Sequence, residues 1–217
     1  PAKMTFQFNY KKYINKHQVE KYNCFINDSL GIELLPGKLK LYHSVVRRKN
    51  NKKNKLLGIN PGASYGSAKR WHPKKFSDVA AELSDDFDII IFGGKSETNF
   101  ASDIEKNLTT ASITNYQNLA GKTELDELIY LISELDIFIT GDSGPMHIAA
   151  ALGIPTISIF GPTNDKETSQ WMNSKSVTIK KNLNCQPCMK RTCPLKHQDC
   201  MKLITASEVI VEAKRLG

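Results

Sequence analysis

The chain has 217 residues, of which 40% are hydrophobic and 24% are charged, enough apolar material to form a folded core. It contains no run near the ~18 apolar residues of a membrane span and no signal-peptide pattern, so we expect a cytoplasmic protein. The formal net charge of +8 favours anionic partners. Part of this charge lies in the basic segment 47–55, which we interpret as a solvated linker.

In chain order, helical spacing of apolar residues predicts a first helix within 12–30, ending before Gly31 and followed by an extended connection. From residue 56 onward, apolar runs alternate with helical patterns. The expected strands span 56–60, 87–94, 112–121, 136–140, 156–161 and 176–181. The expected helices span 73–85, 97–107, 123–135, 145–153 and 206–217, with Thr123 and Asp126 forming a capping box in the third. This alternation predicts an α/β fold, a Rossmann-like doubly wound parallel sheet covered by helices on both faces.

Sheets of this kind bind ligands at the carboxyl ends of their strands, where loops lead into helices. Four polar loops are expected at that edge, spanning 61–72, 93–97, 141–145 and 161–168. The first contains Lys69, a cation suited to a diphosphate, and the second contains Lys95 and Glu97, which can reach a ribose or a second phosphate. Each loop alone is a weak signal, but four together indicate a nucleotide site.

The segment "ITGDSGPMH" (139–147) is the most informative of these loops. The free N–H groups of the helix that follows carry partial positive charge, so a phosphate can bind there, with His147 as a further donor. Helix capping by Asp142 or Ser143 is an equally good explanation from these residues alone. No G-x-G-x-x-G pattern occurs in this loop or at 58–66, which disfavours NAD.

Three segments carry a resemblance to a known family: "NPGASYGSAKRW" (60–71), "LAGKTELDELIYLI" (119–132) and "TGDSGPMHIAAALGIPTISIFGPT" (140–163). They resemble the bacterial ADP-heptose:lipopolysaccharide heptosyltransferases, glycosyltransferase family nine, and are most similar to the heptosyltransferase II group. The resemblance covers 56–217 well and is looser over 1–46. It implies a GT-B glycosyltransferase with two Rossmann domains, of which 56–217 is the half that binds the nucleotide sugar.

The resemblance also implies roles for individual residues. Lys69 matches the family's lysine at the donor phosphates, and Asp142 its aspartate near the heptose; both are candidate catalytic residues. Ser143, Gly144 and His147 match the phosphate-binding turn. The remaining candidate donor-binding residues are Ser64, Lys95, Glu97 and Thr123, with 95–97 at the ribose and Thr123 at the adenine.

The implied reaction is an inverting transfer of heptose from ADP-heptose to the inner core of lipopolysaccharide, a Kdo- or heptose-bearing lipid A, without metal or cofactor. The acceptor implies peripheral contact with the cytoplasmic face of the inner membrane. The family's general base is an aspartate in a Gly-Asp turn near the start of the N-terminal domain, and no such turn precedes residue 56. We therefore expect 1–46 to be the closing segment of that acceptor-side domain and the chain alone to transfer heptose slowly or not at all, since losing a general base costs ~10²–10⁴-fold.

Four cysteines cluster at Cys185, Cys188, Cys193 and Cys200, with His197 among them. The Cys-x-x-Cys pair invites a metal, yet zinc ribbons separate two such pairs by roughly 12–20 residues. We interpret the cluster as reduced thiols and assign no metal. Two other functions stay open: a sugar-nucleotide epimerase or a transferase of another sugar, and a nucleic-acid-binding protein. The last is disfavoured because 47–55 lacks the aromatic residues that such surfaces interleave with cations. Packing is the expected role of Trp71 and Trp171, although Trp71 could wall the donor site.

Overall fold

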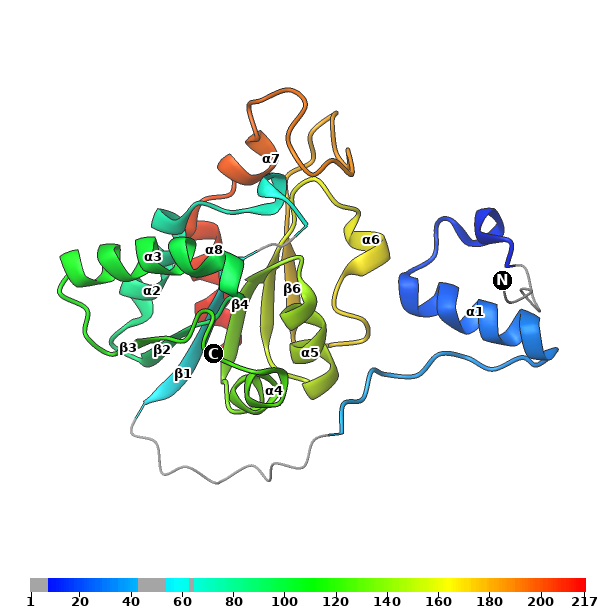
Figure 1. The fold of residues 1–217 in the computed structure, drawn as a ribbon, viewed down its shortest axis with the longest axis horizontal. Coiled ribbons are helices and arrows are strands. Elements are labelled where there is room, and N and C mark those ends of the chain that lie inside the picture. Colours follow the sequence, from blue (N-terminus) through cyan, green and yellow to red (C-terminus); the bar gives the residue numbers. More distant parts are fainter. Residues whose placement is uncertain (1–7, 43–53, 63–64) are drawn as a thin grey trace.

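A computed structural model describes residues 8–42, 54–62 and 65–217 of the chain. Its centre is a six-stranded sheet in which every neighbouring pair is parallel (Figure 1). The strand order is β3-β2-β1-β4-β5-β6. The strands are β1 (Lys55–Asn60), β2 (Phe87–Ile91), β3 (Tyr116–Asn118), β4 (Ile137–Gly141), β5 (Thr156–Ile159) and β6 (Ser176–Ile179). The predicted doubly wound parallel sheet is confirmed.

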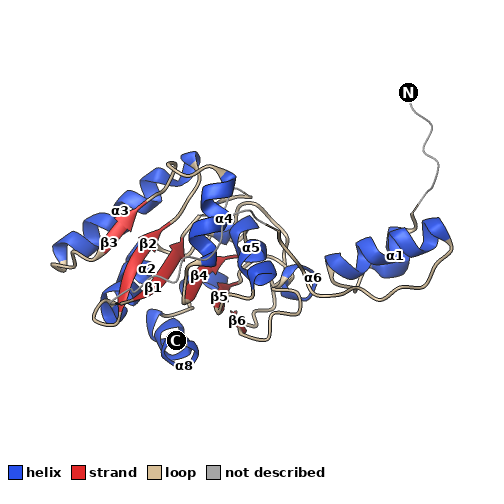
Figure 2. Cartoon of the chain, turned by 90° about the horizontal axis from the view of Figure 1, so that it is seen from below, coloured by secondary structure: helices blue, strands red, loops and turns tan. Residues whose placement is uncertain are grey.

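Helices cover both faces of the sheet, as Figure 2 shows for α4 and α5 on one side and α8 on the other. The larger core joins one sheet face to α2, α3 and α8, and the smaller joins the other face to α4 and α5. These helices are α2 (Pro73–Leu83), α3 (Thr98–Thr110), α4 (Leu125–Ser133), α5 (Gly144–Leu152) and α8 (Ala206–Leu216). The short helices are α6 (Asp165–Thr168) and α7 (Asp199–Lys202), with 3-10 turns at Tyr10–Tyr13, Ser67–Lys69 and Lys95–Glu97.

Some local predictions were wrong. The strand predicted at 87–94 ends at Ile91, because the backbone leaves the sheet before Gly93 and Gly94. The expected capping box of Thr123 and Asp126 does not form: α4 begins at Leu125, and its N-cap residue Glu124 makes no side-chain capping bond. Thr123 instead lines the cavity described below.

Helix α1 (Gln18–Leu30) lies beside α6, away from the sheet (Figure 1). His17 caps its start, and the left-handed Gly31 (φ 66°) ends it, as predicted. An ion pair between Lys21, which is 1% exposed, and Glu167 (2.8 Å) links it to α6, and the His17 ring packs on Trp171 beside it. Most of the expected linker 47–55 lies outside the described residues, and Lys55 begins β1. None of the described helices is long and apolar enough to cross a bilayer.

Candidate functional site

The strand order reverses between β1 and β4, where a doubly wound sheet opens a crevice at its carboxyl edge. Asn60 ends β1 and pairs in register with Thr140 of β4. The Asn60 amide donates to Thr140 Oγ1 (3.2 Å) and to Ser143 Oγ (3.1 Å), and the two hydroxyls are themselves 3.1 Å apart. This network fixes the start of the loop that leads into α5.

Ser143 is the N-cap residue of α5, yet its hydroxyl makes no capping bond. It is held by Asn60 and Thr140 instead. The Asp142 carboxylate is also engaged elsewhere, as described next. Neither side chain therefore occupies the helix N-terminus, so the capping explanation of this loop is not realised and the partial positive charge there stays available to an anion.

Lys69 and Asp142 form the central ion pair of the site. Lys69 Nζ lies 2.6 Å from Asp142 Oδ2 and 3.3 Å from the backbone oxygen of the same residue. Thr163 Oγ1 donates to the same carboxylate oxygen (2.7 Å). Asp142 is only 7% exposed, so these two donors compensate for burying its charge. Three of the four predicted loops thus meet at this carboxylate.

His147 lies one turn into α5, facing the same charges. Burial lowers the pKa of its imidazole below the ordinary value, and the nearby charges of His17 and Lys69 act in the same direction, against Asp142. His147 is therefore neutral at neutral pH and can donate a hydrogen bond from one ring nitrogen only.

A cavity of about 270 Å³ opens at the reversal of strand order. Predicted site residues Glu97, Thr123, Ser143 and Gly144 all line it. The others that line it are Asn60, Gly93, Gly94, Ser96, Leu128 and Pro145. The fold therefore brings the end of β1, the loops after β2 and β4, and the start of α4 to one concave surface, of the kind that doubly wound proteins use for nucleotides.

Glu97 is held in place within this cavity. Its carboxylate accepts a hydrogen bond from the Gly94 N–H (2.8 Å). The same carboxylate occupies the space that a Cβ on Gly62 would fill. Glycine at position 62 thus lets an acidic side chain approach the backbone of the loop after β1. The run of small residues in "NPGAS" is the sequence pattern that indicates such a close approach.

Not every predicted site residue is brought into the cavity. Lys95 is exposed on the 3-10 turn Lys95–Glu97 and does not line it. Ser64 lies outside the described residues. Lys69, Asp142 and His147 are not cavity-lining residues either, but Asp142 directly precedes Ser143, which is.

The segment 185–200 supports the loop that carries Lys69, a function that sequence reasoning missed. The Ala68 N–H donates to the Arg191 oxygen (3.0 Å), and the Tyr65 hydroxyl donates to the Met189 oxygen (2.9 Å). Lys69 and Arg191 also place their cations 4.6 and 5.2 Å from the centre of the Tyr65 ring. The sequence signal available was Tyr65 itself, a lone aromatic among small residues.

The four cysteines of this segment are free thiols. Burial, together with Cys188, Cys193 and Cys185, raises the pKa of Cys200 to about 11, so its thiol is protonated at neutral pH. In the described part of the chain, no three His, Cys, Asp or Glu side chains are arranged to hold a metal ion.

Trp71 has the packing role expected of it. It is buried, its indole N–H donates to the Ile204 oxygen (3.0 Å), and its ring meets Phe76 edge-on at 4.9 Å. It therefore does not wall the donor cavity.

Comparison with known proteins gives consistent results. The family model described as "Glycosyltransferase family 9 (heptosyltransferase)" matches residues 3–198. The chain is 44% identical to lipooligosaccharide heptosyltransferase 2 of Campylobacter jejuni over 222 residues, covering 99% of this chain and 68% of that protein. It is 36% identical to lipopolysaccharide heptosyltransferase 2 of Escherichia coli over 110 residues, 50% of this chain and 32% of that protein.

Among solved structures, that of E. coli ADP-heptose lps heptosyltransferase II is similar, with a TM-score of 0.68 and 26% identity. The match covers 87% of this chain and 56% of that one. The chain thus spans about two thirds of the Campylobacter protein and just over half of the E. coli structure. Because the family model matches most of the chain, and the 44% identity to the Campylobacter protein extends over 99% of it, the chain belongs to glycosyltransferase family 9, the heptosyltransferase family.

Proposed function

We propose that the chain is the donor-binding part of a heptosyltransferase of the second type, which transfers heptose from ADP-heptose to the inner core of lipopolysaccharide or lipooligosaccharide. The observation that carries the proposal is the cavity at the reversal of strand order, beside an uncapped helix N-terminus and the Lys69–Asp142 pair. The names of the Campylobacter and E. coli relatives supply the sugar and the acceptor.

In this proposal the nucleotide lies in the cavity, with its adenine toward Thr123 and its ribose hydroxyls on the Glu97 carboxylate. The diphosphate lies at the N-terminus of α5, where Ser143, Gly144 and His147 surround it. A neutral His147 donates one hydrogen bond to a phosphate oxygen. Ser64, in the loop after β1, and Lys95, at the rim, are assigned to the same ligand.

Lys69 and Asp142 have the chemical role. Transfer breaks the bond between the heptose C1 and the diphosphate oxygen, so negative charge grows on the departing ADP. The Lys69 ammonium, aimed by Asp142 and Thr163, neutralises that charge. Removal of the proton from the acceptor hydroxyl needs a base, which we assign to the acceptor-side domain.

We further propose the division of the chain that the sequence indicates: 56–217 as the donor domain, 47–55 as a basic linker and 1–46 as the closing segment of the acceptor-side domain. Helix α1 lies beside α6 and away from the sheet, which supports this division of the chain. The net charge of +8 supports an anionic acceptor and work at the cytoplasmic face of the inner membrane.

Calorimetric titration of this chain with ADP, UDP and GDP tests the donor site. We expect ADP to bind more tightly than the other two, and Lys69→Ala to weaken it about tenfold or more, as expected for losing a charge-assisted contact. The matched control is Lys106→Ala, which removes an exposed lysine of α3. Equal binding of the three nucleotides, or ADP binding that Lys69→Ala leaves intact, would contradict the proposed function.

A further inference from the structure

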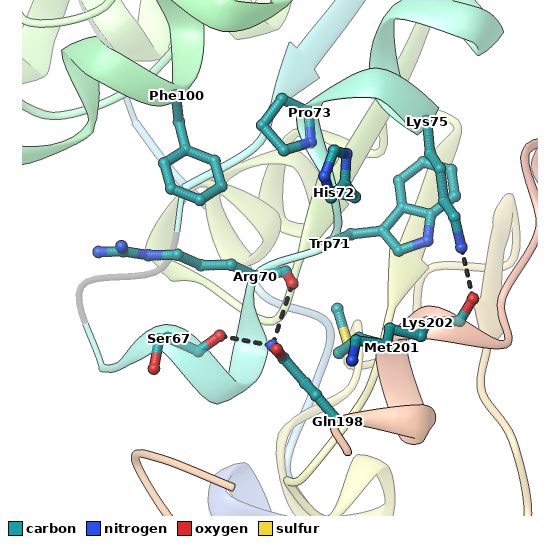
Figure 3. A pocket seen from close by; sticks show the side chains of 10 residues that line it. All are labelled: Ser67, Arg70, Trp71, His72, Pro73, Lys75, Phe100, Gln198, Met201 and Lys202. Atoms are coloured by element: carbon teal, nitrogen blue, oxygen red, sulfur yellow. Dashed lines mark hydrogen bonds between the residues drawn. The ribbon is translucent and has the colours of Figure 1, made fainter. Parts of the chain in front are cut away.

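A second cavity, of about 420 Å³, is lined in part by Ser67 and Arg70, which flank Lys69 in the same loop (Figure 3). It shares no lining residue with the cavity at the reversal of strand order. Lys69 and Arg70 are consecutive, yet Lys69 contacts Asp142 whereas Arg70 lines this second cavity, with its side chain running past Phe100 (Figure 3). The two concave surfaces are therefore separate, and the loop that carries Lys69 lines only the second.

The charge of the second cavity has one sign. Arg70, Lys75 and Lys202 line it together with His72, and none of the described lining residues is acidic; the carboxylate of Glu208 acts on Lys75 from outside the lining. Lys75 is already engaged, because its ammonium donates to the backbone oxygens of Lys202 (2.5 Å) and Ile204 (2.6 Å). Arg70 and Lys202 are the cations that remain to meet a ligand.

Arg70 has unused hydrogen-bonding capacity. Its Nε is buried and has no hydrogen-bond partner among the described residues. Its guanidinium lies 5.0 Å from the centre of the Phe100 ring, which holds the side chain in the cavity (Figure 3). A buried donor without a partner costs free energy that an anionic acceptor would recover.

The helix behind the cavity adds to its positive potential. Pro73 is the first residue of α2, and the ring of His72 caps that helix by accepting the Lys74 N–H (3.2 Å). The amino end of an α-helix of this length carries partial positive charge. Its contribution has the same sign as those of Arg70 and Lys202.

The walls of the cavity are apolar as well as basic. Pro73, Phe100 and Met201 line it beside the edge of the buried Trp71. Gln198 closes one side, where its amide donates to the Ser67 oxygen (2.8 Å), as Figure 3 shows. A bare inorganic anion would use the cations and leave these walls empty.

From this combination we infer that the cavity binds a phosphate-bearing lipid, with its phosphate on Arg70 and Lys202 and its first methylenes against Phe100 and Met201. The inference stands independently of the donor site. Burying each methylene contributes about 0.8 kcal/mol, so the chain start adds affinity that a soluble phosphate ester cannot supply.

Three soluble probes test it by calorimetric titration. Dihexanoyl phosphatidic acid carries both features, dihexanoyl phosphatidylcholine has the chains but no net charge, and glycerol 3-phosphate has the phosphate but no chains. We expect the first to bind about tenfold more tightly than either of the others. Equal binding of phosphatidylcholine would overturn the inference, and so would equal binding of glycerol 3-phosphate, which would mark a site for a soluble phosphate ester.

Variants then locate the site. We expect Arg70→Met and Lys202→Met each to weaken phosphatidic acid binding by roughly fivefold to tenfold, and Lys106→Met, which removes the same charge from exposed α3, to have no effect. Similar losses of phosphatidic acid affinity in all three variants would show a general attraction of the lipid to a basic protein, and would overturn the assignment of the lipid to this cavity.

Lys202→Met also serves if Arg70→Met does not fold, since Lys202 is exposed on α7. Its ADP titration should match the parent chain, so a failed donor site and a failed lipid site give different results.

Discussion

The carboxylate of Glu97 occupies the space beside Gly62 where any other residue would place its Cβ. Glu97 comes from the turn after β2 and Gly62 from the loop after β1, so this contact sets how closely that loop approaches a lining residue of the donor cavity. Gly62→Ala should displace the carboxylate from the Gly94 N–H and weaken ADP binding about tenfold. Calorimetry measures the effect.

The matched control for that prediction is Gly37→Ala, because a Cβ at Gly37 meets nothing within 4 Å. Both variants add one methyl group to a loop, but only the first adds it beside Glu97. Unchanged ADP affinity in Gly62→Ala, with the parent's thermal stability, would show that Glu97 does not touch the nucleotide.

Thr163→Val removes the hydroxyl that donates to the buried Asp142 carboxylate and changes the side-chain volume little. We expect a loss of about 1–3 kcal/mol in the free energy of unfolding, because a buried charged acceptor loses one of its donors. ADP binding should weaken as well, since Asp142 aims Lys69. Thr110→Val, which removes an exposed hydroxyl bonded within its own helix, should cost less than about 0.5 kcal/mol in urea titrations.

Lys21→Met tests the attachment of α1. The variant leaves the carboxylate of Glu167 without its ammonium partner, and Lys21 also donates to the Tyr10 hydroxyl (3.0 Å). We expect faster hydrogen exchange throughout α1, equivalent to a loss of about 2–3 kcal/mol in the free energy of opening the helix. The loss is small for a broken buried pair because Glu167 is partly exposed.

Lys16→Met is the control for this attachment, because its pair with Glu20 is exposed and 3.7 Å long. Its effect should stay below about 0.5 kcal/mol. Equal exchange rates in the two variants would mean that the buried pair does not hold α1 in place.

His147 should make the protein less stable in mild acid. Because burial lowers its pKa below the ordinary value of 6.5, the unfolded chain takes up a proton that the folded site resists as the pH falls through that range. The free energy of unfolding should therefore begin to drop as the pH falls toward 6.5 and keep dropping below it, and His147→Gln should flatten that slope. Thr110→Val, which changes no titratable group, should retain the parent's slope in the same urea titrations.

The core of the fold was predictable because its signal is local. "LLGIN", "DIFIT" and "TISIF" are apolar runs set between helical patterns, and each became a buried parallel strand. The meeting of the loops after β1, β2 and β4 followed from that topology alone. The strand predicted within 112–121 shortened to Tyr116–Asn118, since an edge strand has one neighbour to extend it.

What could not be predicted depends on partners far apart in the chain. A lysine at position 21 gives no sign of burial, because the carboxylate that makes burial possible lies 146 residues away. By its position in the sequence, Asp142 could cap the helix that follows it. In the fold its carboxylate accepts hydrogen bonds from Lys69 and Thr163 instead, and neither is close to it in the sequence. The second cavity could not be predicted because the visible pattern of 185–200 is its cysteines, whereas Gln198 contributes through a hydrogen bond to the Ser67 oxygen, 131 residues away.

The support that 185–200 gives to that loop has a consequence for how the family can vary. The acceptors at Met189 and Arg191 are backbone oxygens, which every amino acid supplies. Most side chains of 185–200 can therefore be replaced without loss of these contacts to the loop that carries Lys69. Inserting or deleting one residue would instead move the acceptor oxygens away from their donors. We expect related chains to differ freely in composition here but to keep the length of this segment constant.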